Sequence, residues 1–183
     1  LLAHMAYTDG LVTLFAFGGN FAAAEFGMKP EDILVFGIVL NVAAGAGAAA
    51  FAWIDDAIGS RRTIMLALTG LIVSGCGLVL TRDEWVFWAL AVLLGIFVGP
   101  AQAAGRSMMA RLSPPGIETE MFGLYALAGK ATAFAGPLCL GVMVQWTGSQ
   151  RAGLATVVVF LTVGLLLMFT VKEPDRAETA VNT

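Results

Sequence analysis

The sequence predicts an all-α, polytopic membrane protein with six transmembrane helices. Of its 183 residues, 58% are hydrophobic and 13% are charged, and the mean hydropathy is +0.85. Soluble domains usually contain about 25% charged residues. The apolar runs are continuous and match the roughly 20 residues that cross a bilayer as a helix. They are rich in Ala, Leu and Gly and do not alternate with polar residues, which argues against membrane strands.

The six predicted spans have enough residues to cross a membrane at 1.5 Å per residue, and they cover residues 1–28, 33–54, 63–80, 85–105, 121–146 and 152–171. The second, third, fourth and sixth spans contain no charged residue. The first contains His4, Asp9 and Glu25, and the fifth contains Lys130. The remaining residues, 172–183, are polar, and we expect them to form a short disordered tail.

The basic residues of the connecting segments predict the orientation. Six follow the second, fourth and sixth spans, namely Arg61, Arg62, Arg106, Arg111, Lys172 and Arg176. The opposite side has three, namely Lys29, Arg82 and Arg151. The positive-inside rule therefore predicts that the Leu1 end, the 55–62 loop, the 106–120 loop and the tail are cytoplasmic. Interfacial tryptophans are expected near the outer boundary, at Trp85, Trp88 and Trp146.

Four of the few charges lie in the predicted loop between the second and third spans. Asp55 and Asp56 precede Gly59, and Arg61 and Arg62 follow it. A solvated turn that carries the positive-inside signal explains the arginines but not the aspartates. A cytoplasmic charge clamp, with Gly59 permitting a sharp reversal, explains all of them. Composition alone leaves both interpretations open.

The motif DAIGSRR at 56–62 resembles the loop of the major facilitator superfamily that joins the second and third helices of each six-helix half. That loop has an Asp, two residues, a Gly and then basic residues. This sequence departs from it by Ala52 in place of a glycine, by Ala57 in place of a basic residue, and by the additional Asp55.

Four further segments are similar to one branch of that superfamily, the bacterial group related to the autophagy-linked vacuolar amino-acid effluxers of fungi. They read YTDGLVTLFAFGG at 7–19, QAAGRS at 102–107, FGLYALAGK at 122–130 and TGSQRAG at 147–153. The resemblance extends over essentially the whole chain. It implies the C-terminal half of a twelve-helix secondary transporter, built as a three-plus-three inverted repeat. The start of the chain at Leu1, without Met, also favours a fragment.

Lys130 is the clearest candidate for a functional residue inside the membrane. It lies ten residues beyond Glu120, which is about 15 Å along a helix. A charge near the bilayer centre costs roughly 2.5–3.5 kcal/mol on insertion scales. An ion pair that only joins helices is one interpretation, and a cavity site that attracts a substrate carboxylate or pairs with a proton-carrying carboxylate is the other. Asp9 is the one deep acid that could pair with it.

Three further polar residues are candidates for the transport cavity, namely Asn41, Gln102 and Arg106. Gln102 and Arg106 are four residues apart and share a helix face. Arg106 could instead be a positive-inside anchor. We expect Gly99-Pro100 to weaken or kink the fourth span. Glu25 and His4 are interpreted as interfacial residues.

The distribution of these residues supports the resemblance. Strongly polar side chains occur in the first, second, fourth and fifth spans, whereas the third and sixth offer only Thr, Ser and Cys. In the facilitator fold, the corresponding third and sixth helices stand outside the cavity. The small residues at 43–50 predict close helix packing.

Several classes of protein are disfavoured. A net charge of −3 does not suit nucleic-acid binding, and one His argues against a membrane-embedded enzyme. We expect no cofactor, catalytic residue or metal site, and the glycines at 95–99 lack the Lys-Ser/Thr ending of a phosphate loop. Cys76 and Cys139 are expected to be buried small side chains.

The predicted function is therefore a secondary transporter of small solutes that works by alternating access. From the resemblance, the solutes would be amino acids, moved by efflux through a bacterial inner membrane, with protons as the candidate coupling ion. The partners would be a small-molecule substrate, the bilayer and a second six-helix half. The alternatives are a facilitator for another substrate, such as a sugar or a drug, and a non-transporting membrane scaffold.

Overall fold

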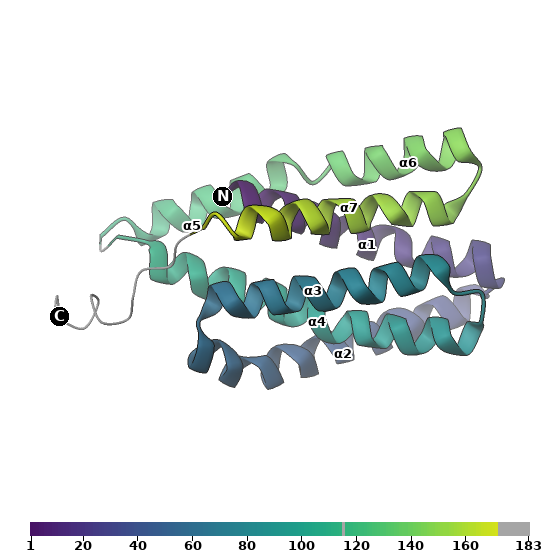
Figure 1. Cartoon of the computed structure of the whole chain (residues 1–183), viewed down its shortest axis with the longest axis horizontal. Coiled ribbons are helices and arrows are strands. Elements are labelled where there is room, and N and C mark those ends of the chain that lie inside the picture. The colour runs from purple at the N-terminus through teal and green to yellow at the C-terminus, as the bar shows by residue number, and fades with distance from the viewer. Residues whose placement is uncertain (115, 172–183) are drawn as a thin grey trace.

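The computed structural model describes residues 1–114 and 116–171, and these residues form seven α-helices joined by short turns. The helices are α1 (Leu2–Phe26), α2 (Pro30–Ile58), α3 (Ser60–Leu80), α4 (Glu84–Leu112), α5 (Glu118–Ala131), α6 (Ala135–Thr147) and α7 (Gln150–Met168). They run along one long axis (Figure 1). The turns after α1, α3 and α6 lie at one end, and those after α2 and α4 lie at the other. The predicted tail, 172–183, falls outside the described residues.

The all-helical prediction is confirmed for the described residues. Five helical segments are long and apolar enough to cross a membrane, with α5 and α6 counted together as Glu118–Thr147. The 25-residue α1 is not among them, because His4, Asp9, Asn20 and Glu25 interrupt its apolar sequence. It nevertheless runs beside α7 in the same bundle.

The helices extend beyond the predicted limits at the end that carries the α2–α3 turn. The predicted apolar spans end at about residues 54 and 105, whereas the helices continue further, α2 to Ile58 and α4 to Leu112. Hydropathy marks where the apolar run stops, and nothing at 55–58 or 106–112 stops a helix. The predicted 55–62 and 106–120 loops shrink accordingly, and Gly59 alone separates α2 from α3.

The fifth span is not the continuous helix that we predicted. Residues Thr132–Phe134 interrupt it and divide it into α5 and α6. The helical assignment of α4 continues through Pro100, and the weakening or kink expected at Gly99-Pro100 stays a prediction.

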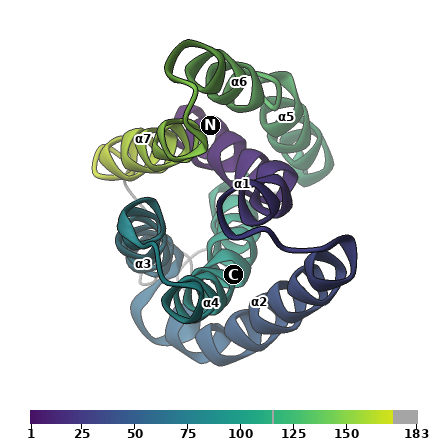
Figure 2. The ribbon, with the colours of Figure 1, turned by 90° about the vertical axis from the view of Figure 1, so that its right-hand side faces the viewer.

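The spans form two triplets, α1 to α3 and α4 to α7, with α5 and α6 counted as one span, and the first helix of each triplet packs mainly against the other triplet. The first span of each triplet packs against the second and third spans of the other: α4 contacts α2 and α3, and α1 contacts the α5–α6 segment and α7. The two third spans, α3 and α7, contact each other and lie on one side of the bundle (Figure 2). Exchanging the triplets maps these contacts onto themselves, as a three-plus-three repeat requires.

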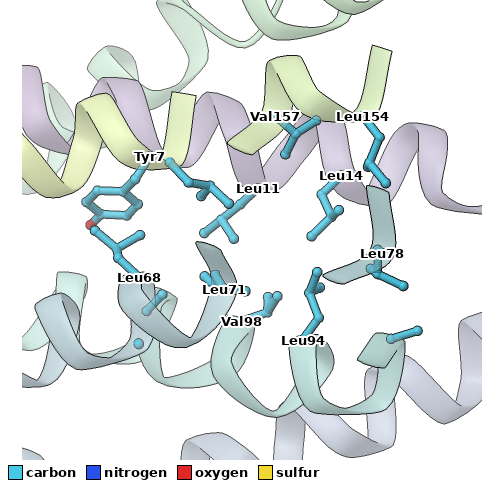
Figure 3. Close-up of a cluster of buried hydrophobic side chains, with 14 of the residues drawn as sticks. Tyr7, Leu11, Leu14, Leu68, Leu71, Leu78, Leu94, Val98, Leu154 and Val157 are labelled. Carbon is cyan, nitrogen blue, oxygen red and sulfur yellow. The ribbon is translucent and has the colours of Figure 1, made fainter. Parts of the chain in front are cut away.

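The core lies where α1, α3, α4 and α7 converge. Tyr7, Leu11 and Leu14 of α1 point toward Leu68 and Leu71 of α3 and toward Leu94 and Val98 of α4 (Figure 3). All seven side chains are buried. Since this core holds the two triplets together, it fixes the relative positions of the helices that carry the polar candidates.

The expectation of close packing by the small residues of α2 is confirmed at Gly47. A Cβ atom built there would lie 1.9 Å from the Ile96 carbonyl oxygen of α4. Gly99 of α4 lies equally close to the backbone of α2, because a Cβ atom built there would lie 1.9 Å from the Ala44 carbonyl oxygen. The two backbones therefore touch where neither helix has a side chain.

The expectation that both cysteines are buried is wrong, because Cys76 and Cys139 are free and exposed. In this bundle an apolar run does not imply burial, since lipid can cover the outer face of a spanning helix.

Candidate functional site

Four of the five cavity candidates are exposed on neighbouring helices of the bundle. They are Asn41 on α2, Gln102 and Arg106 on α4, and Lys130 at the end of α5. The amide of Asn41 donates to the Gly37 carbonyl of its own helix at 2.8 Å. Contacts join α4 to both α2 and α5. Exposed charges on spanning helices are costly against lipid, so Arg106 and Lys130 each need a polar environment.

Asp9, the fifth candidate, has a different position. Its residue exposure is 1%, and its Oδ2 accepts a hydrogen bond of 2.7 Å from the backbone N–H of Gly136, in the first turn of α6. Its Oδ1 is buried and has no hydrogen-bond partner. The structure does not contain the hypothesised Asp9–Lys130 ion pair. Lys130 is exposed, whereas Asp9 is buried and accepts a hydrogen bond from the main chain at the start of α6.

The interruption between α5 and α6 creates this contact. The turn at Thr132–Phe134 starts a new helix, so the N–H of Gly136 has no helical acceptor and is available to Asp9. Gly136 also permits the close approach, because a Cβ atom there would lie 2.1 Å from Oγ1 of Thr13. That hydroxyl donates to the Asp9 carbonyl at 2.7 Å.

A cluster of aromatic and hydroxyl side chains near Asp9 was not predicted. The His4 ring of α1 stacks on Tyr125 of α5, with 3.7 Å between centroids and 17° between planes. Nδ1 of His4 lies 3.1 Å from the Tyr7 hydroxyl and 3.0 Å from the Thr8 hydroxyl. His4, which we interpreted only as interfacial, thus joins α1 to α5.

Gly105 of α4 leaves space for the hydroxyl groups of both tyrosines of the chain, Tyr7 and Tyr125. A Cβ atom built at Gly105 would lie 2.6 Å from the Tyr7 hydroxyl and 2.8 Å from that of Tyr125. Arg106 follows Gly105 directly, so its charge lies beside this cluster. The signal that could have revealed the cluster is that the only two tyrosines lie in segments that also carry candidate residues, 7–19 and 122–130.

The charged residues around Gly59 form contacts other than the expected ones. Gly59 has φ 89° and ψ 153°, as the sharp reversal between α2 and α3 requires. Oδ2 of Asp55 lies 3.6 Å from Nη2 of Arg111 on α4, and Oδ1 of Asp56 lies 3.8 Å from the same atom. The additional acid, Asp55, is the buried one, whereas the side chain of Asp56 is 80% exposed.

Arg61 contacts a different helix. Its guanidinium donates to the carbonyls of Met168 and Phe169, at the C-terminus of α7, at 3.2 and 3.0 Å. The Met168 carbonyl also accepts from the Val171 N–H at 3.2 Å, and a cation at this helix end is favoured by the helix dipole. We expected Asp55 to pair with the arginines that follow Gly59. Its ion-pair partner is instead Arg111 of α4. Arg62 is exposed on α3.

Replacing Arg111 with glutamine should lower the free energy of unfolding by about 1 kcal/mol, because the mostly buried Asp55 loses its cation. In a double-mutant cycle, Asp55→Asn with Arg111→Gln should give a coupling energy of about 0.5–1 kcal/mol. Arg62→Gln removes an exposed arginine nearby and is the matched control. Thermal unfolding of the purified protein in detergent measures both effects. Equal midpoints for Arg111→Gln and Arg62→Gln would contradict this assignment.

Another arginine joins three helices at the opposite end of the bundle. Nε of Arg151 in α7 donates to Oε2 of Glu25 in α1 at 2.7 Å. Its Nη1 donates to the carbonyls of Val79 and Thr81, at the end of α3. Glu25, interpreted as interfacial, is therefore the acid of an ion pair between α1 and α7.

Comparison with known protein families gives one matching family model, described as "Vacuole effluxer Atg22 like", which covers residues 1–181. The chain belongs to the Atg22-like family. Its relatives include an uncharacterized MFS-type transporter, YxiO, of Bacillus subtilis, which is 24% identical over 100% of this chain and 42% of its own length. Autophagy-related protein 22-2 of Aspergillus niger is 26% identical, and autophagy-related protein 22-1 of Penicillium rubens is 28% identical.

Both fungal alignments cover 97% of this chain and 32% of the relative. The chain thus spans well under half the length of the curated relatives that it matches. Membership in the Atg22-like family confirms the resemblance to the major facilitator superfamily. It identifies the protein as an integral membrane protein of a transporter family, and the polar surface described above belongs to a bundle of that type. In the described residues, no group of three or more His, Cys, Asp or Glu side chains could hold a metal ion.

Proposed function

We propose that this chain is the C-terminal six-helix half of a secondary transporter that moves small solutes by alternating access. The observation that carries the proposal is the exposure of Arg106 and Lys130 on helices long enough to span a membrane. A second six-helix half would cover this polar surface and leave a water-filled cavity between the halves. The relatives' lengths agree with such an arrangement, because this chain accounts for 42% or less of each one cited above.

The proposed substrates are amino acids, and the proposed direction is efflux. The family description, "Vacuole effluxer", supports the direction. Arg106 and Lys130 could attract a carboxylate, while Asn41 and Gln102 supply uncharged donors and acceptors. The His4–Tyr125 stack would offer an aromatic wall for the substrate side chain. The proposed coupling ion is the proton.

We further propose that the protein lies in a bacterial inner membrane, with the α2–α3 and α4–α5 turns in the cytoplasm. This orientation puts Arg61, Arg62 and Arg111 on the inside. The Asp55–Arg111 pair would then act as part of a cytoplasmic gate, since it joins α2 to α4 near that surface. It would break and re-form as the two halves rock.

Labelled leucine counterflow tests the substrate and the site together. The assay uses proteoliposomes of the full-length protein, meaning this chain with its proposed partner half. Wild type should show saturable counterflow, and Lys130→Ala should abolish it because the substrate carboxylate loses its cation. Arg82→Ala removes an exposed cation from the α3–α4 turn and should leave counterflow unchanged.

The outcomes separate the competing functions. Counterflow of a sugar or drug in place of leucine would overturn the amino-acid assignment and keep the transporter. A protein whose biological activity survives both Lys130→Ala and Asp9→Ala, with no solute flux, would be a membrane scaffold. Residues 1–183 alone supply half of the proposed cavity, so saturable uptake by liposomes of that chain would contradict the need for a second half.

A further inference from the structure

The carboxyl group of Asp9 in α1 is buried and only partly satisfied by hydrogen bonds. Its Oδ2 accepts one hydrogen bond, from Gly136, and its Oδ1 accepts none. The residue is 1% exposed, so water does not replace the missing partner. Burial of an ionised carboxylate with so few partners is unfavourable unless its charge is neutralised.

Among the described residues, no salt bridge joins Asp9 to a cation of a neighbouring helix. On α7, the residues that face the neighbouring Gly10 are Phe160 and Leu161. The one ionisable side chain of α7 is Arg151, which pairs with Glu25. On α6, residues 135–147 contain no Asp, Glu, Lys, Arg or His. The other charged and titratable groups are His4, Tyr7 and Glu25 on α1, Glu118, Glu120, Tyr125 and Lys130 on α5, and Glu84, Arg106 and Arg111 on α4. Arg106 and Lys130 are exposed.

The hydrogen-bond partner of Asp9 responds to the charge of the carboxyl group. An ionised carboxylate forms a charge-assisted bond with a backbone N–H and is favoured beside a helix N-terminus. Gly136 is in the first turn of α6, a helix of 13 residues. Protonation would leave Oδ2 as a neutral, weaker acceptor. The strength of the link between α1 and α6 therefore depends on whether Asp9 carries a proton.

The adjacent turn allows that link to control a movement. Residues Thr132–Phe134 separate α5, which carries Lys130, from α6, which carries Gly136. Because the two segments are not one continuous helix, α6 can change its angle to α5 without breaking a regular helical ladder. Discontinuous spanning helices recur at the ion and substrate sites of transporters.

We propose that Asp9 is the proton-binding residue of the transport cycle and that its protonation loosens α6 from α1 at the Thr132–Phe134 turn. The proton enters from the aqueous phase on one side, binds at Oδ1, and leaves as water on the other side takes it up. Ionised Asp9 holds the N-terminus of α6, and protonated Asp9 releases it. This inference rests on the proposed transport function, and it names the coupling ion, its residue and the element that responds.

Asp9→Asn tests the proposal, because asparagine has nearly the same shape, keeps an oxygen for the Gly136 N–H and cannot release a proton. In proteoliposomes of the full-length protein, Asp9→Asn should retain labelled leucine counterflow, which needs no net proton movement. It should lose substrate movement driven by a pH gradient. Glu31→Gln removes an exposed carboxyl from the first turn of α2 and should retain both activities. Gradient-driven transport by Asp9→Asn would overturn the proposal.

Infrared spectroscopy provides a readout that does not depend on transport. Acidification of the wild-type protein in lipid should produce the carbonyl stretch of a protonated, buried carboxyl group. The band should be missing from Asp9→Asn and present in Glu31→Gln. Its absence from wild type across the pH range would overturn the proposal even if Asp9→Asn fails to fold. Absence of wild-type counterflow together with a band assigned to Asp9 would instead overturn the leucine assignment and leave proton binding in place.

Discussion

Replacing Gly99 with alanine is expected to destabilise the bundle by about 1–3 kcal/mol or more, the range seen when extra atoms are forced into a well-packed interior. The new Cβ atom would lie 1.9 Å from the Ala44 carbonyl oxygen. The obstacle is backbone, so no side chain can rotate away, and α2 and α4 must separate. Gly47→Ala should act in the same way through the Ile96 carbonyl oxygen.

Thermal unfolding of the full-length protein in detergent measures this effect. Gly45→Ala is the matched control, because it lies on α2 two residues from Gly47 and a Cβ atom there meets nothing within 4 Å. Alanine at this helical position should be neutral or stabilising by up to about 1 kcal/mol. The double variant Gly47→Ala, Gly99→Ala should cost less than the sum of the single changes, because the first substitution already separates the helices. Equal midpoints for Gly99→Ala and Gly45→Ala would show that the two backbones do not touch.

The second large effect is expected at Gly136, where alanine should abolish substrate transport. Its Cβ atom would lie 2.1 Å from Oγ1 of Thr13 and 3.2 Å from Oδ1 of Asp9. The start of α6 must therefore move away from α1, and the hydrogen bond from the Gly136 N–H to Asp9 is lost. That leaves the carboxyl group buried without any partner, a further cost of about 1–3 kcal/mol.

Leucine counterflow and thermal unfolding should both respond to Gly136→Ala. Gly141→Ala is the control on the same helix, because its Cβ atom meets nothing within 4 Å. The second-site change Thr13→Ala removes the closest obstacle and should restore part of the stability. Full activity of Gly136→Ala would mean that the contact between Asp9 and α6 has no part in transport.

Much of the architecture could be predicted from the sequence, because the bilayer imposes a length on each apolar run. The positions of the turns near Gly27, Gly59 and Gly148 follow from glycines with positive φ between such runs. The helix ends at Ile58 and Leu112 could not be read from hydropathy, since a helix continues into water as long as its residues permit it. The charges at 55–56 and 106–111 are therefore helical residues, which brings Arg111 within reach of Asp55.

The break in the fifth span was not predicted, and the fourth span continues through its proline. Pro100 has no N–H, so the Ile96 carbonyl four residues earlier lacks its helical donor. That carbonyl lies against Gly47 of α2, and the close contact of the two helices supports α4 through the proline. In the fifth span, Gly136-Pro137 is the signal that was missed, because Pro137 has no N–H for the Ala133 carbonyl four residues earlier. The start of α6 is also held by Asp9, which is more than 120 residues away in the sequence and accepts a hydrogen bond from the Gly136 N–H.

The candidate site was predicted by residue type but not by arrangement. Lys130 and Asp9 stand out in any sequence because charges are rare in spanning helices. Their separation could not be foreseen, since it depends on which face of α5 turns toward α1. The contacts between His4 and Tyr125, and between Tyr7 and Gly105, depend on packing between distant segments, which periodicity does not report.

The packing of α1 against helices of the other triplet has a consequence for biosynthesis. During translation, α1 enters the bilayer before α6 and α7 exist, although these are among its main neighbours in the finished bundle. It is also the long helix with too little hydropathy to count among the candidate membrane spans. The ribosome must add more than 120 further residues before Gly136 can meet Asp9 and Arg151 can meet Glu25. Until then α1 depends on the insertion machinery or on another helix to shield its polar residues, so its final stabilisation waits for α6 and α7.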